Sequence, residues 1–192
     1  MGAVRHLRTL APLALVAGLL AACGNDSSSS SSVDDSTVVA SSGGFEIRPV
    51  FARYAPGVPF GPQLPEALVN EMKQQSCPMK PREVQGMLME CDAGKTVYLL
   101  KNPVVSDDVA SATAKQVGNQ DIWYVQVGLD ENGTSAIDTL VKDQVGTELA
   151  FSYGGKVLTS VVVDQSLHPS RIGLIGDFDK AQATQLASQL AG

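Results

Sequence analysis

The chain has 192 residues and a formal net charge of −6 at pH 7. This acidic balance argues against nucleic-acid partners and against electrostatic docking to anionic lipid headgroups. Residues 1–22 differ from the rest of the chain, because they have the composition of a targeting segment.

Residues 1–22 are predicted to be a lipoprotein signal peptide. Arg5 and Arg8 supply a basic start, and the apolar run 10–22 is too short for a typical transmembrane helix. The run ends in Leu-Ala-Ala-Cys, which resembles the lipobox of bacterial lipoproteins. This resemblance implies that Cys23 becomes the lipidated N-terminus and that the mature protein is anchored by lipid to the extracytoplasmic face of the cell membrane. Without Arg5 and Arg8, 12 basic residues remain against 20 acidic ones, a net charge of −8.

Residues 23–44 are expected to form a flexible tether. Ser27 to Ser32 are all serine, and the segment has no hydrophobic period, so it cannot bury enough apolar surface to offset the entropy lost on ordering. Residues 45–192 then have the length of one ordinary domain with its own core.

Cys77 and Cys91 are predicted to form a disulfide. Exported proteins keep such cysteines oxidised, and closing a loop of about 15 residues stabilises a fold by about 3 kcal/mol in the chain-entropy model. Their spacing is not that of a CxxC redox pair.

The first half of the domain predicts a strand over Phe45–Phe51, with Pro49 favouring an edge position or a strand end. The elements expected after it are a loop over 52–64, a helix that opens at Pro65 and ends before Cys77, and two strands, 87–91 and 96–100, around a turn at 92–94.

The second half predicts a helix over Ser106–Val117 and a strand over Ile122–Leu129. The elements expected after these are a turn at 130–133, a helix capped by Thr134 or Ser135, a hairpin of strands 149–153 and 156–163 around Gly154-Gly155, a strand over 171–175, and a last helix capped by Asp179 and Gln182 that buries Ala183, Leu186, Ala187 and Leu190. This order predicts an α+β fold, with helices packed on one face of a mainly antiparallel sheet.

The domain resembles the head of the first extracytoplasmic domain of SecD, most clearly after residue 122. The segments that carry the resemblance are Trp123–Val127, Gly133-Thr134, Leu149–Val157, Ile175–Phe178 with the helix after it, and Phe45–Val50, which is similar to actinobacterial SecD proteins. The resemblance implies the fold of that head and a role in handling exported polypeptides. We expect no proton-driven transport, because no segment of the sequence is predicted to form a channel through a membrane.

Candidate chemistry is sparse. His168 is the one histidine of the mature chain, no Gly-x-Ser-x-Gly elbow exists, and the acidic pairs near 107 and 177 favour helix starts over catalysis. The segment 130–133 lacks the later glutamate of a calcium loop, and the methionines at 72, 79, 87 and 89 suit a core better than Cu(I). We therefore expect no catalytic residue, no metal and no cofactor.

The sequence thus favours a non-enzymatic binding or accessory module, with an exported polypeptide or an envelope protein as its partner. One hypothesis is a role in protein export. The alternative is an envelope adaptor for one fixed partner, with no role in export.

Overall fold

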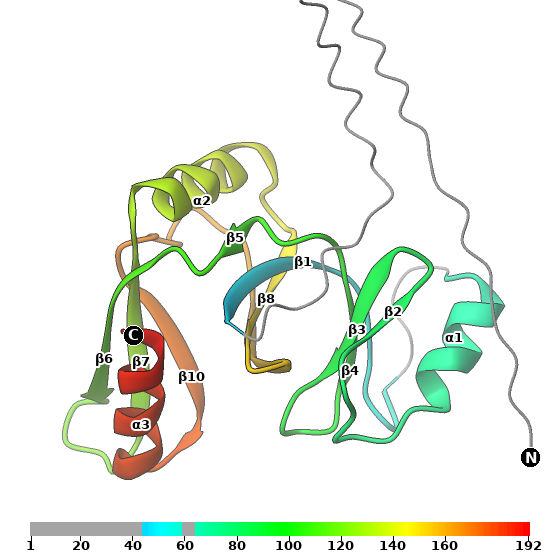
Figure 1. The fold of residues 1–192 in the computed structure, drawn as a ribbon, viewed down its shortest axis with the longest axis horizontal. Helices are drawn as coiled ribbons and strands as arrows, with labels where there is room; N and C mark the ends of the chain where they lie inside the picture. The colour runs from blue at the N-terminus through cyan, green and yellow to red at the C-terminus, as the bar shows by residue number, and fades with distance from the viewer. Residues whose placement is uncertain (1–43, 59–63) are drawn as a thin grey trace, which may run out of the picture. The chain divides into compact units, whose positions relative to one another are not determined.

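The computed structural model describes residues 44–58 and 64–192 (Figure 1). The predicted signal peptide, Cys23 and all of the tether except Gly44 lie outside the described residues. The elements found in the described ranges are, in chain order, β1 (Phe45–Tyr54), α1 (Glu66–Lys73), β2 (Arg82–Val84), β3 (Met87–Cys91), β4 (Val97–Leu100), β5 (Val105–Ser106), β6 (Val109–Gln116), β7 (Trp123–Leu129), α2 (Glu131–Asp143), β8 (Glu148–Tyr153), β9 (Lys156–Val162), β10 (Ile172–Phe178) and α3 (Lys180–Leu190).

The strands form two sheets, and every pairing between named strands is antiparallel. The larger sheet has the order β2-β3-β4-β1-β8-β9, with β5 also paired to β1. The smaller sheet has the order β10-β7-β6. The predicted α+β class with mainly antiparallel strands is therefore confirmed, although the structure has two sheets where the sequence suggested one.

β1 is a central strand and Pro49 lies in its interior, so the prediction that Pro49 marks an edge or a strand end is wrong. β1 pairs with β8 through Phe45–Pro49 and with β4 through Val50–Tyr54. The Pro49 carbonyl accepts a hydrogen bond from the Lys101 amide at 2.9 Å. The N–H and C=O of one residue point to the same side of a strand, so the hydrogen bond that proline cannot donate would lie on the side of the chain between β4 and β5. The hydrogen bonds between β1 and β8 are therefore not interrupted.

Both faces of the first half of β1, Phe45–Pro49, are buried, in different surroundings. Phe45 and Ile47 lie in an apolar core that joins both sheets with α2 and α3. Glu46 and Arg48 lie on the opposite face and are 0% exposed. A second apolar cluster forms where α1 packs on β3 and β4.

The predicted helix over Ser106–Val117 is wrong, because this segment forms β5 and β6. Asp107 lies in the turn between β5 and β6, where it has a positive φ of 57°. Its Oδ1 accepts a hydrogen bond from the Phe45 amide at 2.9 Å. β6 then pairs with β7 as far as Gln116. The tertiary ladder thus outweighs the helix propensity of the alanines in this segment.

The helix starts are partly as predicted. α2 begins at Glu131 instead of after a turn, and its cap is Asp130, whose side chain accepts from the Gly133 amide, in place of Thr134 or Ser135. α3 has the predicted capping box of Asp179 and Gln182 and the predicted buried face. The Gly154-Gly155 hairpin is confirmed, and both glycines have positive φ, as a two-residue turn of this kind requires.

Candidate functional site

β6 is the longest strand that presents a free edge in the part of the chain that the structure describes, and after an irregularity between Val109 and Ser111 it pairs regularly as far as Gln116. It ends the smaller sheet and pairs with β7 alone. Of the other sheet ends, β2 has three residues, β10 is irregular between Ile175 and Phe178, and β9 is approached by β3 through a bridge between Val157 and Asp92. A free edge carries unpaired backbone N–H and C=O groups, and an extended chain can add to them as a further strand.

The side chains of β6 leave this edge open. Ser111, Thr113 and Lys115 are exposed, whereas Ala112 and Ala114 turn toward the apolar core. Lys115 is the one charged residue of the strand, and β6 contains no proline. Proteins commonly block sheet edges with several charges or a proline, and this strand has little of either.

Exposed apolar side chains lie at the end of the smaller sheet where the β6–β7 turn is located. Val117 and Ile122, joined by a backbone hydrogen bond of 2.9 Å, are 41% and 46% exposed. Ile175 of β10 is 67% exposed and lies opposite Tyr124, which in turn lies opposite Lys115. Residues paired directly across strands share a face of the sheet. Ile175, Tyr124 and Lys115 therefore give the outer face of the smaller sheet a mixed aliphatic, aromatic and basic character.

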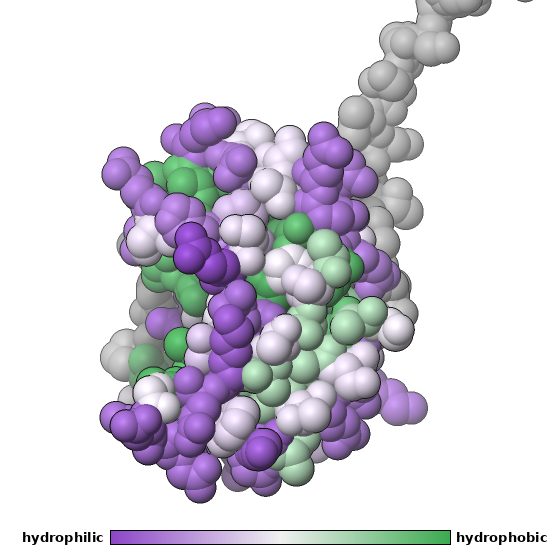
Figure 2. Space-filling model, turned by 90° about the vertical axis from the view of Figure 1, so that its left-hand side faces the viewer, coloured by the Kyte–Doolittle hydropathy of each residue, from purple (hydrophilic) through white to green (hydrophobic). Residues whose placement is uncertain are grey.

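α3 flanks the same sheet. It packs on β6 and β7, and the Lys180 ammonium of its first turn lies 5.5 Å from the centre of the Trp123 ring. Figure 2 faces the side of Figure 1 on which α3 and β6 lie, and it shows a weakly hydrophobic band bordered by hydrophilic side chains. Ala110 and Ala181 are exposed alanines of these two elements. We call the free edge of Ser111–Gln116 with its outer side chains the β6 surface.

A second notable region is the charged interior of the larger sheet, which we define as Glu46, Arg48, Glu90 and Ser152. All four are at most 1% exposed. The Arg48 Nε donates to Glu46 Oε2 at 2.8 Å, and its Nη1 donates to the Lys101 carbonyl at 3.1 Å. Both carboxylate oxygens of Glu90 and the Ser152 hydroxyl have no hydrogen-bond partner among the described residues.

Burial raises the pKa of the Glu90 carboxyl above its ordinary value. The nearby Ser152 hydroxyl lowers that pKa, Glu46 raises it through like-charge repulsion, and Arg48 lowers it. Burial also raises the pKa of Tyr98, which lies opposite Glu90 across the β3–β4 pair. No sequence motif marks any of these groups.

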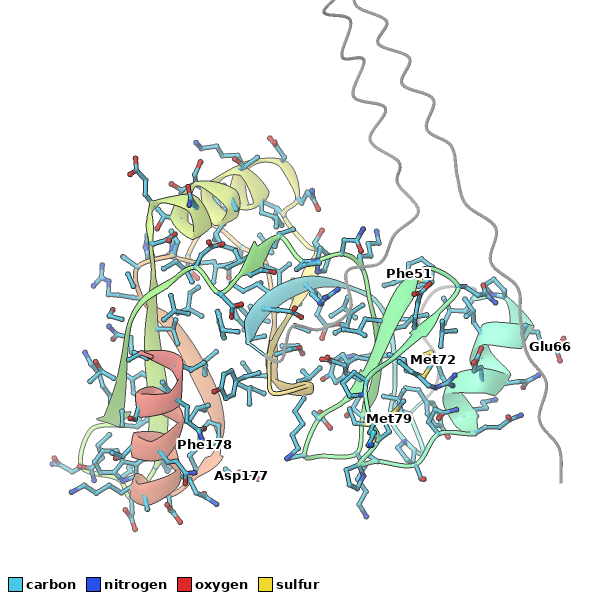
Figure 3. The ribbon with its side chains drawn as sticks, in the orientation of Figure 1. Phe51, Glu66, Met72, Met79, Asp177 and Phe178 are labelled. Atoms are coloured by element: carbon cyan, nitrogen blue, oxygen red, sulfur yellow. A yellow bond between two sulfur atoms is a disulfide. The ribbon has the colours of Figure 1, made fainter. Side chains whose placement is uncertain are left out.

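The structure joins Cys77 and Cys91 in a disulfide. The bond lies in the cluster under α1, together with Met72, Met79, Met87 and Met89. Met72 and Met89 are fully buried there, and Figure 3 labels Met72 and Met79 in this region. The methionines therefore pack as core residues around the disulfide.

The residues weighed for catalysis are not brought together into a constellation. His168 is exposed, and Asp130 and Asp179 cap helices. Asp177 lies on β10 beside Phe178, near the start of α3 (Figure 3). In the described ranges, no group of three or more histidine, cysteine, aspartate or glutamate residues is placed to hold a metal ion. In the same ranges, none of the helices has both the length and the apolar character needed to cross a membrane.

The fold and the β6 surface define an α+β module with two antiparallel sheets and an accessible edge strand. Residues 83–192, more than half of the chain, match the family described as "SecDF, P1 head subdomain", and the chain therefore belongs to this family. The match confirms the SecD-head resemblance for the second half of the domain.

Two solved structures of SecDF are similar to this chain. "Crystal structure of SecDF in Super-membrane-facing form" has a TM-score of 0.49 and 19% identity, over 77% of this chain and 18% of that one. "Structure and function of a membrane component SecDF that enhances protein export" has a TM-score of 0.45 and 18% identity, over 77% of this chain and 61% of that one. The chain thus spans less than two thirds of either structure. No curated protein sequence matches it significantly.

Proposed function

We propose that this protein is a non-enzymatic accessory of protein export, held on the extracytoplasmic face of the cell membrane by lipid on Cys23. In this proposal it binds extended segments of exported polypeptides along the β6 surface. Membership of the SecDF P1 head family supports the link to export. The observation that carries the binding proposal is the free, nearly uncharged edge of β6.

The mode of binding follows from the chemistry of that edge. Backbone hydrogen bonds to a sheet edge depend little on sequence, so they suit a partner that presents many different sequences in extended form. The exposed Val117, Ile122 and Ile175 near one end add apolar contacts of low specificity. An adaptor for one fixed partner would instead recognise particular side chains.

Photo-crosslinking in living cells tests this function. A photo-reactive residue would replace Thr113, which is exposed on β6, and in a matched control Thr139, which is exposed on α2. We expect the Thr113 position to capture many different secretory chains, and the Thr139 position to capture few. Capture of one envelope protein alone at Thr113, with no secretory chains, would overturn the export role and support the fixed-partner adaptor.

The lipid anchor has its own test. We expect mass spectrometry of the membrane-extracted protein to find an N-terminal peptide that begins at Cys23 and carries a diacylglycerol thioether. An anchor of that kind is stable because each buried lipid methylene contributes about 0.8 kcal/mol. A mature N-terminus at another residue, or an unmodified Cys23, would contradict the anchor without affecting the β6 proposal.

A further inference from the structure

The charged interior holds two carboxyl groups and one guanidinium group. Glu46 and Arg48 come from β1, Glu90 comes from β3, and all three are 0% exposed. Arg48 is bound to Glu46 and to the Lys101 carbonyl. If all three groups were ionised, the interior would carry a net negative charge with no counter-ion from solvent, which is costly in a buried site.

Glu90 is the group of the three for which the described residues offer no hydrogen bond. Neither of its oxygens has a partner, although a buried carboxylate ordinarily accepts several hydrogen bonds. The Ser152 hydroxyl on β8 is close enough to lower the pKa of Glu90, and it too lacks a partner. A protonated carboxyl could donate to that hydroxyl and leave the interior electrically neutral.

The other groups that face Glu90 do not supply a second cation. On β4, Tyr98 lies opposite Glu90 and is 4% exposed. Arg53, which lies opposite Tyr98 on β1, is engaged with Glu148 at 3.0 Å and has a side chain that is 59% exposed. Asp92 lies near the Tyr98 hydroxyl at 3.4 Å and adds a further negative charge at that end.

We propose that Glu90 carries a proton in the folded domain, so that the charged interior is a proton-binding site. Occupancy of this site couples the pH outside the membrane to the stability of the larger sheet, because Glu90, Ser152 and Glu46 lie on three different strands of it. Loss of the proton places two carboxylates and one guanidinium group in the same buried space and weakens the packing of β3 against β1 and β8.

The sign of the pH dependence follows from the raised pKa. Below the ordinary glutamate pKa, near 4.5, the carboxyl is neutral in both the folded and the unfolded chain, and the stabilisation is fully present. Between that value and the higher folded pKa, the unfolded chain releases the proton and the folded one keeps it. Over this range the unfolding constant therefore rises about tenfold per pH unit, and stability falls as the pH rises.

The test compares the protein extracted from membranes in detergent with its Glu90→Gln variant, using urea unfolding followed by the fluorescence of Trp123, the one tryptophan of the chain. Glutamine mimics the neutral carboxyl. We expect the wild-type unfolding constant to rise about tenfold per pH unit relative to the variant above pH ~4.5. A matched Glu83→Gln variant, changed at an exposed residue of β2, is expected to follow the wild type. A ratio of wild type to Glu90→Gln that does not change with pH overturns the proposal.

A direct measurement keeps the proposal testable if Glu90→Gln fails to fold. In wild-type protein labelled with carbon-13, the Glu90 side-chain carboxyl carbon, assigned through its own backbone amide, is expected to titrate above the ordinary glutamate pKa of 4.5. The Ser152→Ala variant removes a group that lowers the Glu90 pKa, and it is expected to move this titration to still higher pH. Titration of Glu90 at the ordinary glutamate pKa of 4.5 would show that the folded domain holds no such proton.

Discussion

The two faces of the first half of β1, Phe45–Pro49, are buried in opposite ways. One face places Phe45 and Ile47 in a core of aliphatic and aromatic side chains, where shape and apolar area provide the stability. The other face places Glu46 and Arg48 in a charged interior, where each group needs a partner. The difference teaches that alternation along a strand gives the two faces of a sheet but not which of them meets water. Substitutions on the two faces should therefore fail for different reasons.

The largest effect is expected from Arg48→Met. Methionine preserves much of the volume, but the buried Glu46 carboxylate loses the guanidinium group that neutralises it, so the free energy of unfolding should fall by about 4 kcal/mol. Urea unfolding followed by Trp123 fluorescence measures the change. A double variant, Glu46→Gln with Arg48→Met, should recover most of the loss, since it removes both charges. Equal losses in the single and the double variant would show that the packing of Arg48 matters more than its charge.

Ile47→Ala should cost about 3 kcal/mol, because it opens a cavity in the apolar core next to Phe45. This loss should be independent of pH and of salt, since neither the wild-type nor the variant side chain is charged. The same urea unfolding, repeated at pH 5 and pH 8, checks this. A loss that depended strongly on pH would mean that the two faces of β1 are coupled through the strand.

The parts of the fold that the sequence predicted correctly depend on local signals. Asp179 and Gln182 cap α3, and Gly154-Gly155 turn the β8–β9 hairpin, because a few adjacent residues suffice for each. Ser106–Val117 was wrongly predicted as a helix because its alanines favour a helix, whereas the ladder with β7 across the 117–122 turn makes it a strand. The signal that could have found β6 is the alternation of alanine with Ser111, Thr113 and Lys115, which has the period of a strand.

The candidate sites were harder to predict. The β6 surface was missed together with its strand. The burial of Glu90 could not be read from Met87–Cys91, because a polar residue in an alternating strand ordinarily faces solvent. Its surroundings come from β1 and β8, which are far away in the sequence. The disulfide, by contrast, follows from two cysteines in a chain expected to be exported.

Loss of the disulfide is expected to cost about 3 kcal/mol, and to act mainly on the cluster under α1. This region has few buried side chains of its own, so its amides should exchange faster with solvent in the variant Cys77→Ala with Cys91→Ala. Hydrogen exchange at Met89 and Leu99 measures the local effect, and exchange at Leu174 in the apolar core serves as the reference. Equal acceleration at all three amides would show that the two clusters unfold as one unit.

The smallest effect is expected at the start of α3, which covers the apolar core beside the β6 surface. Asp179→Ala removes the side chain that accepts from the Gln182 amide at 2.8 Å, and the free energy of unfolding should fall by about 1 kcal/mol. Asp179→Asn, which keeps a capping oxygen, should restore most of it. Thermal unfolding of the three proteins checks both values.

Because Lys180 lies over Trp123, fraying of the first turn of α3 should also change the tryptophan fluorescence of the folded protein. A fluorescence change in Asp179→Ala that Asp179→Asn lacks would tie the first turn of α3 to the β6–β7 end of the smaller sheet, whereas unchanged fluorescence would mean that the cap stabilises the helix alone.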